Sequence, residues 1–347
     1  GGAHGRRAVV APVAREQKTG HNQGQTTHGK QTTRPVSRVD DPRTDIAWGP
    51  TGRRFGYNGM MLASSRLRIA ALCGAGLQLG CASHPAVGSV SAAGQPPRNV
   101  LVHGHRGDRG NVPPGNTLPS FRSALGYGVD VLEGDLQITA AGSVVFGHDD
   151  DLGVTGCMWA GSDPASSAWV SKMTDAQLAQ WDCDPAREGT QAPPHLHEVL
   201  ALSESVGFNL ELKRAGTESA DVYLRALIGE DRACGGCLAP RLIVQSFDWA
   251  AIEYVHDTYR EALAVRLSLL ADAPRMDELE AAAGFAQIWS PQQDLATPAA
   301  IAQAHALGLE VAPWTVNEEP DMQRLIDAGV DAIITDVPDV LLRLLGR

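Results

Sequence analysis

Short apolar runs alternate along the chain with stretches in which apolar residues recur every three or four positions. The first pattern is typical of buried strands and the second of helices packed on one face. The predicted strands are 99–103, 129–138, 144–146, 209–213, 241–245, 262–267, 287–290, 310–314 and 332–334. The predicted helices are 117–125, 196–205, 221–228, 249–257, 276–283, 298–306 and 319–328.

Strands and helices that alternate over about 250 residues predict an α/β fold, a TIM-type (β/α)8 barrel spanning 98–347. Nine strands are predicted where a barrel needs eight. The join at 139–143 is too short for a helical crossover, so it predicts a hairpin. One strand of that hairpin is then accessory to the barrel, or another predicted strand is wrong. The long segment 152–194, with a short helix near 174–181, predicts an inserted loop region after the third strand that covers the catalytic face.

The first 97 residues have a different character. Residues 1–59 are rich in Gly, Arg, Thr and Gln, which predicts a disordered or non-native extension. Residues 60–81 have a basic start, an apolar run too short to span a bilayer, and a final Gly-Cys pair. This pattern predicts a signal peptide of the lipoprotein type with a lipid anchor at Cys81, or an ordinary signal peptide cut near 82–83. Residues 82–97 read as a tether, and we expect an exported protein, periplasmic or at the cell surface and anchored to the membrane.

Four cysteines follow the predicted tether, and export would place them in an oxidising compartment. The simplest prediction is a disulfide between Cys157 and Cys183 and another between Cys234 and Cys237. The Cys234-Gly-Gly-Cys237 motif also fits a redox-active pair or half of a zinc site, although neither the helix context nor two further ligands accompany it.

The overall charge limits the partners that the chain can bind. Its formal net charge is -11 and its sequence pI is about 5.4. Nucleic acid binding requires a basic face, so no nucleic acid partner is expected. A phosphate ligand would have to be met locally, by a few cations and a metal. No protein partner is indicated.

Polar residues gather at the ends of the first predicted strands. His105 and Arg106 follow the first strand; the guanidinium can hold a phosphate and the imidazole can transfer a proton. Glu133 and Asp135 share one face of the next strand. Neighbouring carboxylates repel one another unless a cation lies between them, and their oxygens suit a hard metal, Ca²⁺ or Mg²⁺. His148 follows the third strand.

A later strand repeats this pattern. Glu211 and Lys213 share one face, as a candidate third metal ligand and a second phosphate-binding cation. His103 lies two positions before His105, and two imidazoles on one strand face would also suit the zinc site of an amidohydrolase. We interpret His103 as packing inward instead.

The order of these motifs resembles that of the glycerophosphodiester phosphodiesterases. The family pattern of His-Arg-Gly, a Pro-Glu-Asn-Thr turn, Glu-x-Asp and His-Asp is followed by Glu-x-Lys, Ser-Phe, Trp-Thr and Thr-Asp. The corresponding residues here include His105-Arg106-Gly107, Glu133-Gly134-Asp135, His148-Asp149, Glu211-Leu212-Lys213, Ser246-Phe247, Trp314-Thr315 and Thr335-Asp336.

The resemblance implies a barrel with a divalent cation, Ca²⁺ or Mg²⁺, held by Glu133, Asp135 and Glu211. It assigns acid–base catalysis to His105 and His148. It assigns substrate binding to Arg106, Lys213 and Trp314, the last of these lining a glycerol pocket. The implied reaction converts a small glycerophosphodiester to glycerol 3-phosphate and an alcohol, with attack by a glycerol hydroxyl or by water.

Two positions depart from the family pattern. Gly115 replaces the usual Glu of the turn, and Gly147 separates Phe146 from His148. The alternatives left open are the same family acting on lysophospholipids or phosphoglycerol polymers, a zinc amidohydrolase-like hydrolase, and a catalytically inactive binding protein.

Overall fold

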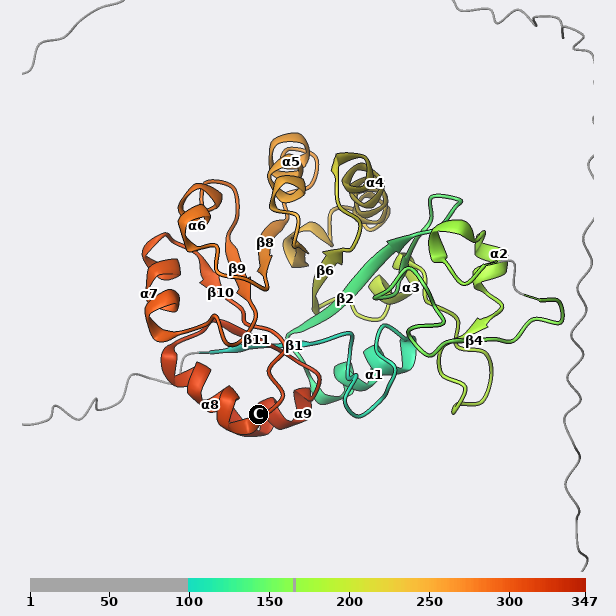
Figure 1. The fold of residues 1–347 in the computed structure, drawn as a ribbon, viewed down its shortest axis with the longest axis horizontal. Coiled ribbons are helices and arrows are strands. Elements are labelled where there is room, and N and C mark those ends of the chain that lie inside the picture. The colour runs from blue at the N-terminus through green and yellow to red at the C-terminus, as the bar shows by residue number, and fades with distance from the viewer. Residues whose placement is uncertain (1–98, 165–166) are drawn as a thin grey trace, which may run out of the picture. The chain divides into compact units, whose positions relative to one another are not determined.

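A computed structural model describes residues 99–164 and 167–347, and within them the chain forms a barrel of parallel strands (Figure 1). Neighbouring strands follow the order β10-β9-β8-β7-β6-β2-β1-β11. The bounds are β1 Leu101–Gly104, β2 Val131–Ile138, β6 Gly207–Leu212, β7 Leu242–Ser246, β8 Arg266–Ala271, β9 Ile288–Pro291, β10 Glu310–Val311 and β11 Ala332–Thr335. Backbone hydrogen bonds from Asp331 to Val311 and from Ile334 to Pro313, both 3.0 Å, close the ring between β10 and β11. The predicted TIM-type barrel is therefore confirmed.

The strand predicted at 144–146 is the accessory one. β3 (Val144–Phe146) runs antiparallel to β2, with Leu136 opposite Phe146. Its partner β2 is paired on both sides within the barrel, with β1 and with β6, so β3 joins only its protruding end. The hairpin predicted at 139–143 is confirmed.

Helices surround the strands (Figure 1). Their bounds are α1 Leu118–Tyr127, α3 Leu196–Leu200, α4 Thr217–Ala233, α5 Trp249–Tyr259, α6 Met276–Ala282, α7 Pro298–Ala306, α8 Glu319–Ala328 and α9 Pro338–Leu344, with a 3-10 turn η2 at Ala239–Arg241. Several start at a side-chain cap: the hydroxyls of Thr117 and Thr297 and the carboxylate of Asp248 accept backbone N–H groups of the first turn. Their apolar faces, including Phe121, Tyr223 and Leu325, pack on the outside of the sheet.

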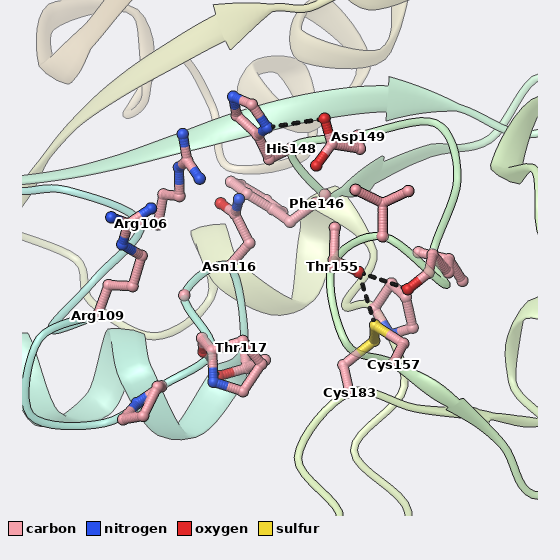
Figure 2. A pocket seen from close by; sticks show the side chains of 17 residues that line it. Arg106, Arg109, Asn116, Thr117, Phe146, His148, Asp149, Thr155, Cys157 and Cys183 are labelled. Carbon is pink, nitrogen blue, oxygen red and sulfur yellow. Dashed lines mark hydrogen bonds and ion pairs between the residues drawn. A yellow bond between two sulfur atoms is a disulfide. The ribbon is translucent and has the colours of Figure 1, made fainter.

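The insertion between β3 and α3 has a small core of its own. It contains β4 (Met158–Trp159), η1 (Val170–Lys172), α2 (Asp175–Leu178) and β5 (Trp181–Asp182). Leu152, Met173 and Leu178 are buried together beside the disulfide of Cys157 and Cys183 (Figure 2). The second predicted disulfide, Cys234–Cys237, is also formed.

Several predicted elements have the wrong bounds. The strand predicted at 310–314 ends at Val311, and the helix predicted at 221–228 spans Thr217–Ala233. Two further differences have a local cause. The strand predicted at 262–267 lies at Arg266–Ala271, because Ala262 and Leu263 donate backbone hydrogen bonds to Tyr259 and extend the end of α5. The helix predicted at 196–205 ends at Leu200. The Ser203 hydroxyl accepts the backbone N–H groups of residues 205 and 206, which offers the chain a turn in place of another helical turn.

The predictions for residues 1–97, including the signal peptide and the lipid anchor at Cys81, lie outside the described residues. In the part of the chain that the structure describes, no helix is both long enough and apolar enough to cross a membrane.

Tyr223 ties the helical layer to the sheet, and its removal tests the packing of α4. Its buried hydroxyl donates to the Leu136 carbonyl of β2 at 2.9 Å. We expect Tyr223→Phe to lower the free energy of unfolding by about 1 kcal/mol in urea titrations, the usual net worth of such a bond. Tyr127→Phe, at a side chain that is 47% exposed, is the control and should change little. Equal effects of the two substitutions would contradict this role of the buried hydroxyl.

Candidate active site

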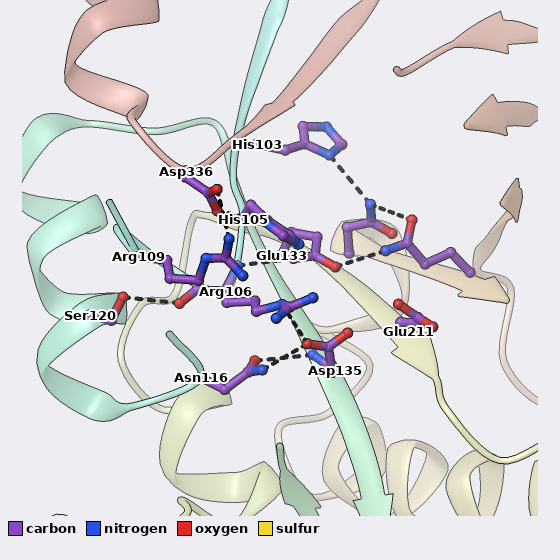
Figure 3. Close-up of polar contacts among 12 residues, drawn as sticks. His103, His105, Arg106, Arg109, Asn116, Ser120, Glu133, Asp135, Glu211 and Asp336 are labelled. Carbon is purple, nitrogen blue, oxygen red and sulfur yellow. Dashed lines mark hydrogen bonds and ion pairs between the residues drawn. The ribbon is translucent and has the colours of Figure 1, made fainter. Parts of the chain in front are cut away.

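Three buried carboxylates lie on the neighbouring strands β2 and β6. Glu133, Asp135 and Glu211 each offer an oxygen within 4.8 Å of the others, and their residues are 2%, 0% and 8% exposed. The strand register produces this cluster, since Asp135 and Glu211 are direct partners in the parallel pair of β2 and β6. The three predicted metal ligands are thus brought together (Figure 3).

The charges of the cluster are only partly balanced by protein cations. Asp135 lies 2.9 Å from Arg106 Nε and 3.7 Å from Lys213 Nζ, and Lys213 also lies 3.0 Å from Glu211. Three carboxylates therefore face two cations. A group of hard oxygen ligands with an excess of negative charge fits a divalent cation such as Ca²⁺ or Mg²⁺.

The pKa values reflect the same imbalance. Burial, followed by repulsion from Asp135, raises the pKa of Glu133, and the same two causes raise the pKa of Glu211 to about 8. Burial alone would raise the pKa of Asp135 too, but Arg106 and Lys213 outweigh it and lower that pKa. The cluster thus accumulates more negative charge than its surroundings stabilise, which is the condition that a bound cation relieves.

The position of Arg106 is fixed by backbone hydrogen bonds as well as by the ion pair of its side chain. Its φ of 54° is in the left-handed region, which is uncommon for a residue with a side chain. The backbone N–H donates to Glu133 at 2.9 Å, and the carbonyl accepts from the Asn116 N–H and the Ser120 hydroxyl. These contacts hold the guanidinium over the carboxylates. Asn116 in turn donates from its side-chain amide to Asp135 at 2.7 Å.

His105 is oriented by a carboxylate from the last strand. Its Nδ1 lies 2.6 Å from Asp336, which follows β11, and its Nε2 lies 4.0 Å from Glu133 (Figure 3). Burial would raise the pKa of Asp336, but its hydrogen bonds with His105 and Asn317 and the charge of Arg109 bring it to about 2. A carboxylate at Nδ1 places the titratable Nε2 toward the carboxylate cluster. Burial lowers the pKa of His105. The imidazole is therefore kept in its neutral form, which is the form that can accept a proton.

His148 comes from the turn after β3. Its Nδ1 lies 3.0 Å from Asp149, its side chain is about one-third exposed, and burial lowers its pKa. Gly147 does not carry it away from the site, because His148 lines the same cavity as His105. The Gly147 N–H donates to the Asp135 carbonyl at 3.0 Å, which fixes the start of the turn against β2.

All eight predicted site residues are close together, seven of them in the wall of one cavity of about 170 Å³ at the carboxyl end of the barrel. The cavity is lined by His105, Arg106, Glu133, His148, Glu211, Lys213, Gln245, Phe247, Leu270, Trp314, Thr315 and Ile334. Asp135 lies against Arg106 and Lys213 behind that wall. Trp314 donates to the Ser290 carbonyl at 2.8 Å and meets Phe247 edge to face, 5.4 Å between ring centres. These two rings give one side of the cavity an apolar surface.

His103 takes no part in this cluster. It is 2% exposed, burial lowers its pKa to about 4, and its Nδ1 lies 3.4 Å from the Asn209 amide. Among the described residues, the carboxylate cluster is the one group of three or more potential ligands close enough to hold a metal. This arrangement speaks against the zinc amidohydrolase alternative, which needs His103 beside His105.

Gly115 is required by the local packing. A Cβ atom at this position would lie 2.4 Å from the Arg106 Cβ and 3.0 Å from its carbonyl oxygen. A glutamate therefore cannot occupy this turn while Arg106 keeps its conformation.

Four residues of the site carried no assigned role in the sequence analysis. Gln245 donates to Glu133 at 2.9 Å, and Asn116, Arg109 and Asp336 make the contacts described above. The strand pattern could have pointed to Asp336 and Gln245, since each lies at the carboxyl end of a barrel strand, where barrel enzymes place their site residues. Asn116 and Arg109 lie in the loop after β1, where strand periodicity gives no signal.

Comparison with known proteins matches this chain and its fold to one family. The family model of the glycerophosphoryl diester phosphodiesterases matches residues 105–340. A glycerophosphodiester phosphodiesterase of Caldanaerobacter subterraneus subsp. tengcongensis is 28% identical over 254 residues, covering 72% of this chain and 98% of that protein.

Solved structures similar to this chain point to the same family. A Silicibacter pomeroyi protein assigned to the glycerophosphoryl diester phosphodiesterases is 31% identical, with a TM-score of 0.63 over 72% of this chain and 94% of that chain. An Oleispira antarctica phosphodiesterase, solved in complex with the product sn-glycerol-3-phosphate, is 22% identical. It shares the fold, with a TM-score of 0.59 over 71% of this chain and 97% of that chain.

The carboxylate cluster predicts stabilisation by divalent cations. A cation that binds only the folded protein, present at a hundred times its Kd, should add about 2.7 kcal/mol to the free energy of unfolding. We expect Ca²⁺ or Mg²⁺ to raise the melting temperature, and Glu133→Gln or Asp135→Asn to remove most of that rise. Glu253→Gln, at an exposed carboxylate on α5, is the control. A full shift in both cluster variants would place the cation elsewhere.

Proposed function

The chain belongs to the glycerophosphoryl diester phosphodiesterase family, and on that premise we propose that it hydrolyses glycerophosphodiesters to glycerol 3-phosphate and an alcohol, with a divalent cation. It is an enzyme of the phosphoric diester hydrolase class. The observation that carries the finer proposal is a single cavity in which two imidazoles and two cations face buried carboxylates. The Oleispira protein was solved with sn-glycerol-3-phosphate as its product, and we propose the same product here.

Binding of the phosphate is the role proposed for Arg106 and Lys213. A phosphodiester anion repels nucleophiles, so its charge must be neutralised before attack. Both cations line the cavity and lie next to the carboxylate cluster, within 4 Å of its oxygens. Glu133, Asp135 and Glu211 would hold the cation, which when bound supplies further positive charge to the phosphate oxygens.

Proton transfer is the role proposed for His105 and His148. The departing alkoxide is a strong base and needs an acid, while the attacking hydroxyl needs a base. The Asp336 contact leaves His105 Nε2 free to face the reacting atoms, and His148 lines the same cavity. Either a glycerol hydroxyl or water is the attacking group in this scheme.

Glycerol binding is proposed for the apolar side of the cavity. Trp314 and Phe247 meet edge to face on that side, and the Trp314 indole is fixed by its bond to the Ser290 carbonyl. A rigid aromatic surface suits the carbon face of a polyol, and Lys213 and Glu211, which line the same cavity, can meet its hydroxyls.

We also propose that the enzyme acts outside the cytoplasm, attached to the membrane through a lipid on Cys81. The motif at 60–81 and the two disulfides of the barrel domain support this proposal, since disulfides persist in oxidising compartments.

Release of glycerol 3-phosphate from glycerophosphocholine tests the proposed reaction. We expect activity that a chelator removes and that Ca²⁺ or Mg²⁺ restores. His105→Ala and Glu133→Gln should each lower kcat by at least about 100-fold, the usual contribution of one acid–base group or of an electrostatic contact. His256→Ala, on α5 beside Asp257, is the control. Chelator-resistant activity, or near-normal turnover in a folded site variant, would refute the assigned roles.

Asp336 should act as a positioning residue for His105. Asp336→Asn keeps the size of the side chain but removes the charge that holds Nδ1–H, so we expect kcat to fall by about 10²–10⁴-fold with KM nearly unchanged. Asp331→Asn is the matched control, because Asp331 pairs with His305 at 2.8 Å before β11 begins. A parallel rise in KM, or an equal loss in the control, would show that Asp336 only maintains the fold.

A further inference from the structure

A second cavity adjoins the proposed catalytic cavity on the side of the insertion (Figure 2). Its volume is about 410 Å³, against about 170 Å³ for the cavity within the barrel. Its walls come from the turn after β1, the turn after β3, and the insertion. The apolar part of the wall consists of Pro113, Pro114, Phe146, Leu152, Val154, Pro193 and the disulfide Cys157–Cys183.

The two cavities meet at the residues proposed to handle the phosphate. Arg106 and His148 line both of them. A phosphate held by Arg106 therefore lies at their junction, with one ester arm directed into the barrel and the other toward the insertion. The smaller cavity, with Trp314 and Lys213, suits the glycerol arm, so the larger one is left for the other alcohol.

The charges in the second cavity disfavour a cationic alcohol. Arg106 and Arg109 both line it, and their guanidiniums pair with Asp135 and Asp336. Asp149 is the one carboxylate among the described residues of its wall, and it pairs with His148. A quaternary ammonium is typically recognised by several aromatic rings, and the described wall has Phe146 alone.

The polar groups deeper in the wall already have partners. The Thr155 hydroxyl donates to the Leu152 carbonyl at 2.8 Å. Leu152 and the two half-cystines are buried, while Val154 at the mouth is 73% exposed. An uncharged alcohol with an apolar chain would cover this surface without leaving a buried charge unpaired.

We propose that this cavity is the site for the second alcohol of the diester, and that it selects an uncharged, apolar arm over a cationic one. The inference rests on the proposed phosphodiesterase function and adds the class of substrate. Val154 is the residue at the mouth whose polarity sets this preference.

Two diesters that differ only in this arm test the proposal: sn-glycero-3-phosphocholine and the hexyl ester of sn-glycerol 3-phosphate. We expect kcat/KM of the wild-type enzyme to be at least about tenfold higher for the hexyl ester, the range for a few buried methylenes. Val154→Asp should lower kcat/KM for the hexyl ester by about tenfold and leave that for the choline ester equal or higher.

Met158→Asp is the matched control. Met158 is a second exposed apolar residue of the insertion, 55% exposed, and it does not line the cavity. It should leave the ratio of the two kcat/KM values unchanged. Val154→Lys gives a second reading if the aspartate variant fails to fold, and it should lower kcat/KM for both esters.

The outcomes distinguish the substrate preference from the reaction itself. Equal kcat/KM for the two esters in the wild-type enzyme, or equal changes in ratio for the variants of Val154 and Met158, would overturn the preference while leaving the phosphodiesterase function intact. Hydrolysis of neither ester would refute the proposed function, and the inference with it.

Discussion

Repulsion among three buried carboxylates is the constraint around which the site is arranged. Glu133, Asp135 and Glu211 carry charges that burial makes costly, and the surrounding groups all reduce that cost. Arg106 and Lys213 supply positive charge, while the side-chain amides of Asn116 and Gln245 donate hydrogen bonds. The unusual backbone conformation of Arg106 belongs to the same arrangement, since its N–H is directed at Glu133. The excess charge that remains is what a divalent cation would bind.

The barrel could be predicted because its strands and helices have different periodicities, and because the join between β2 and β3 is too short for a crossover. The bounds of the elements were less predictable where local hydrogen bonds decide them. The apolar residues 262–265 look like the start of a strand, yet they follow α5 as its last turn. The hydroxyl of Ser203 ends α3 early through a contact that hydrophobic patterning does not reveal. Local polar contacts, invisible in the pattern, set these limits.

The site was predictable to the extent that its residues follow strands. Period-two spacing predicts that Glu133 and Asp135 share one strand face and that Glu211 and Lys213 share another. The parallel pairing of β2 with β6 is what brings the two pairs together. Asp336 was visible as the residue after the last strand. Its pairing with His105 depends on the pairing of that last strand, β11, with the first strand, β1. Arg109 and Asn116 lie on a loop whose path no periodicity describes. Gly115 departs from the family pattern, and packing against Arg106 shows that it is a steric requirement.

The insertion and the barrel are held together by different means. The carboxylates sit on strands that pair on both sides along the barrel, whereas the insertion depends on a small core and one disulfide. Changes in the insertion can therefore alter the outer wall without moving the carboxylates. Such a division lets a lineage exchange one substrate for another by mutation in 152–194 while the reaction itself is preserved, so that chemistry and selectivity can evolve at separate rates.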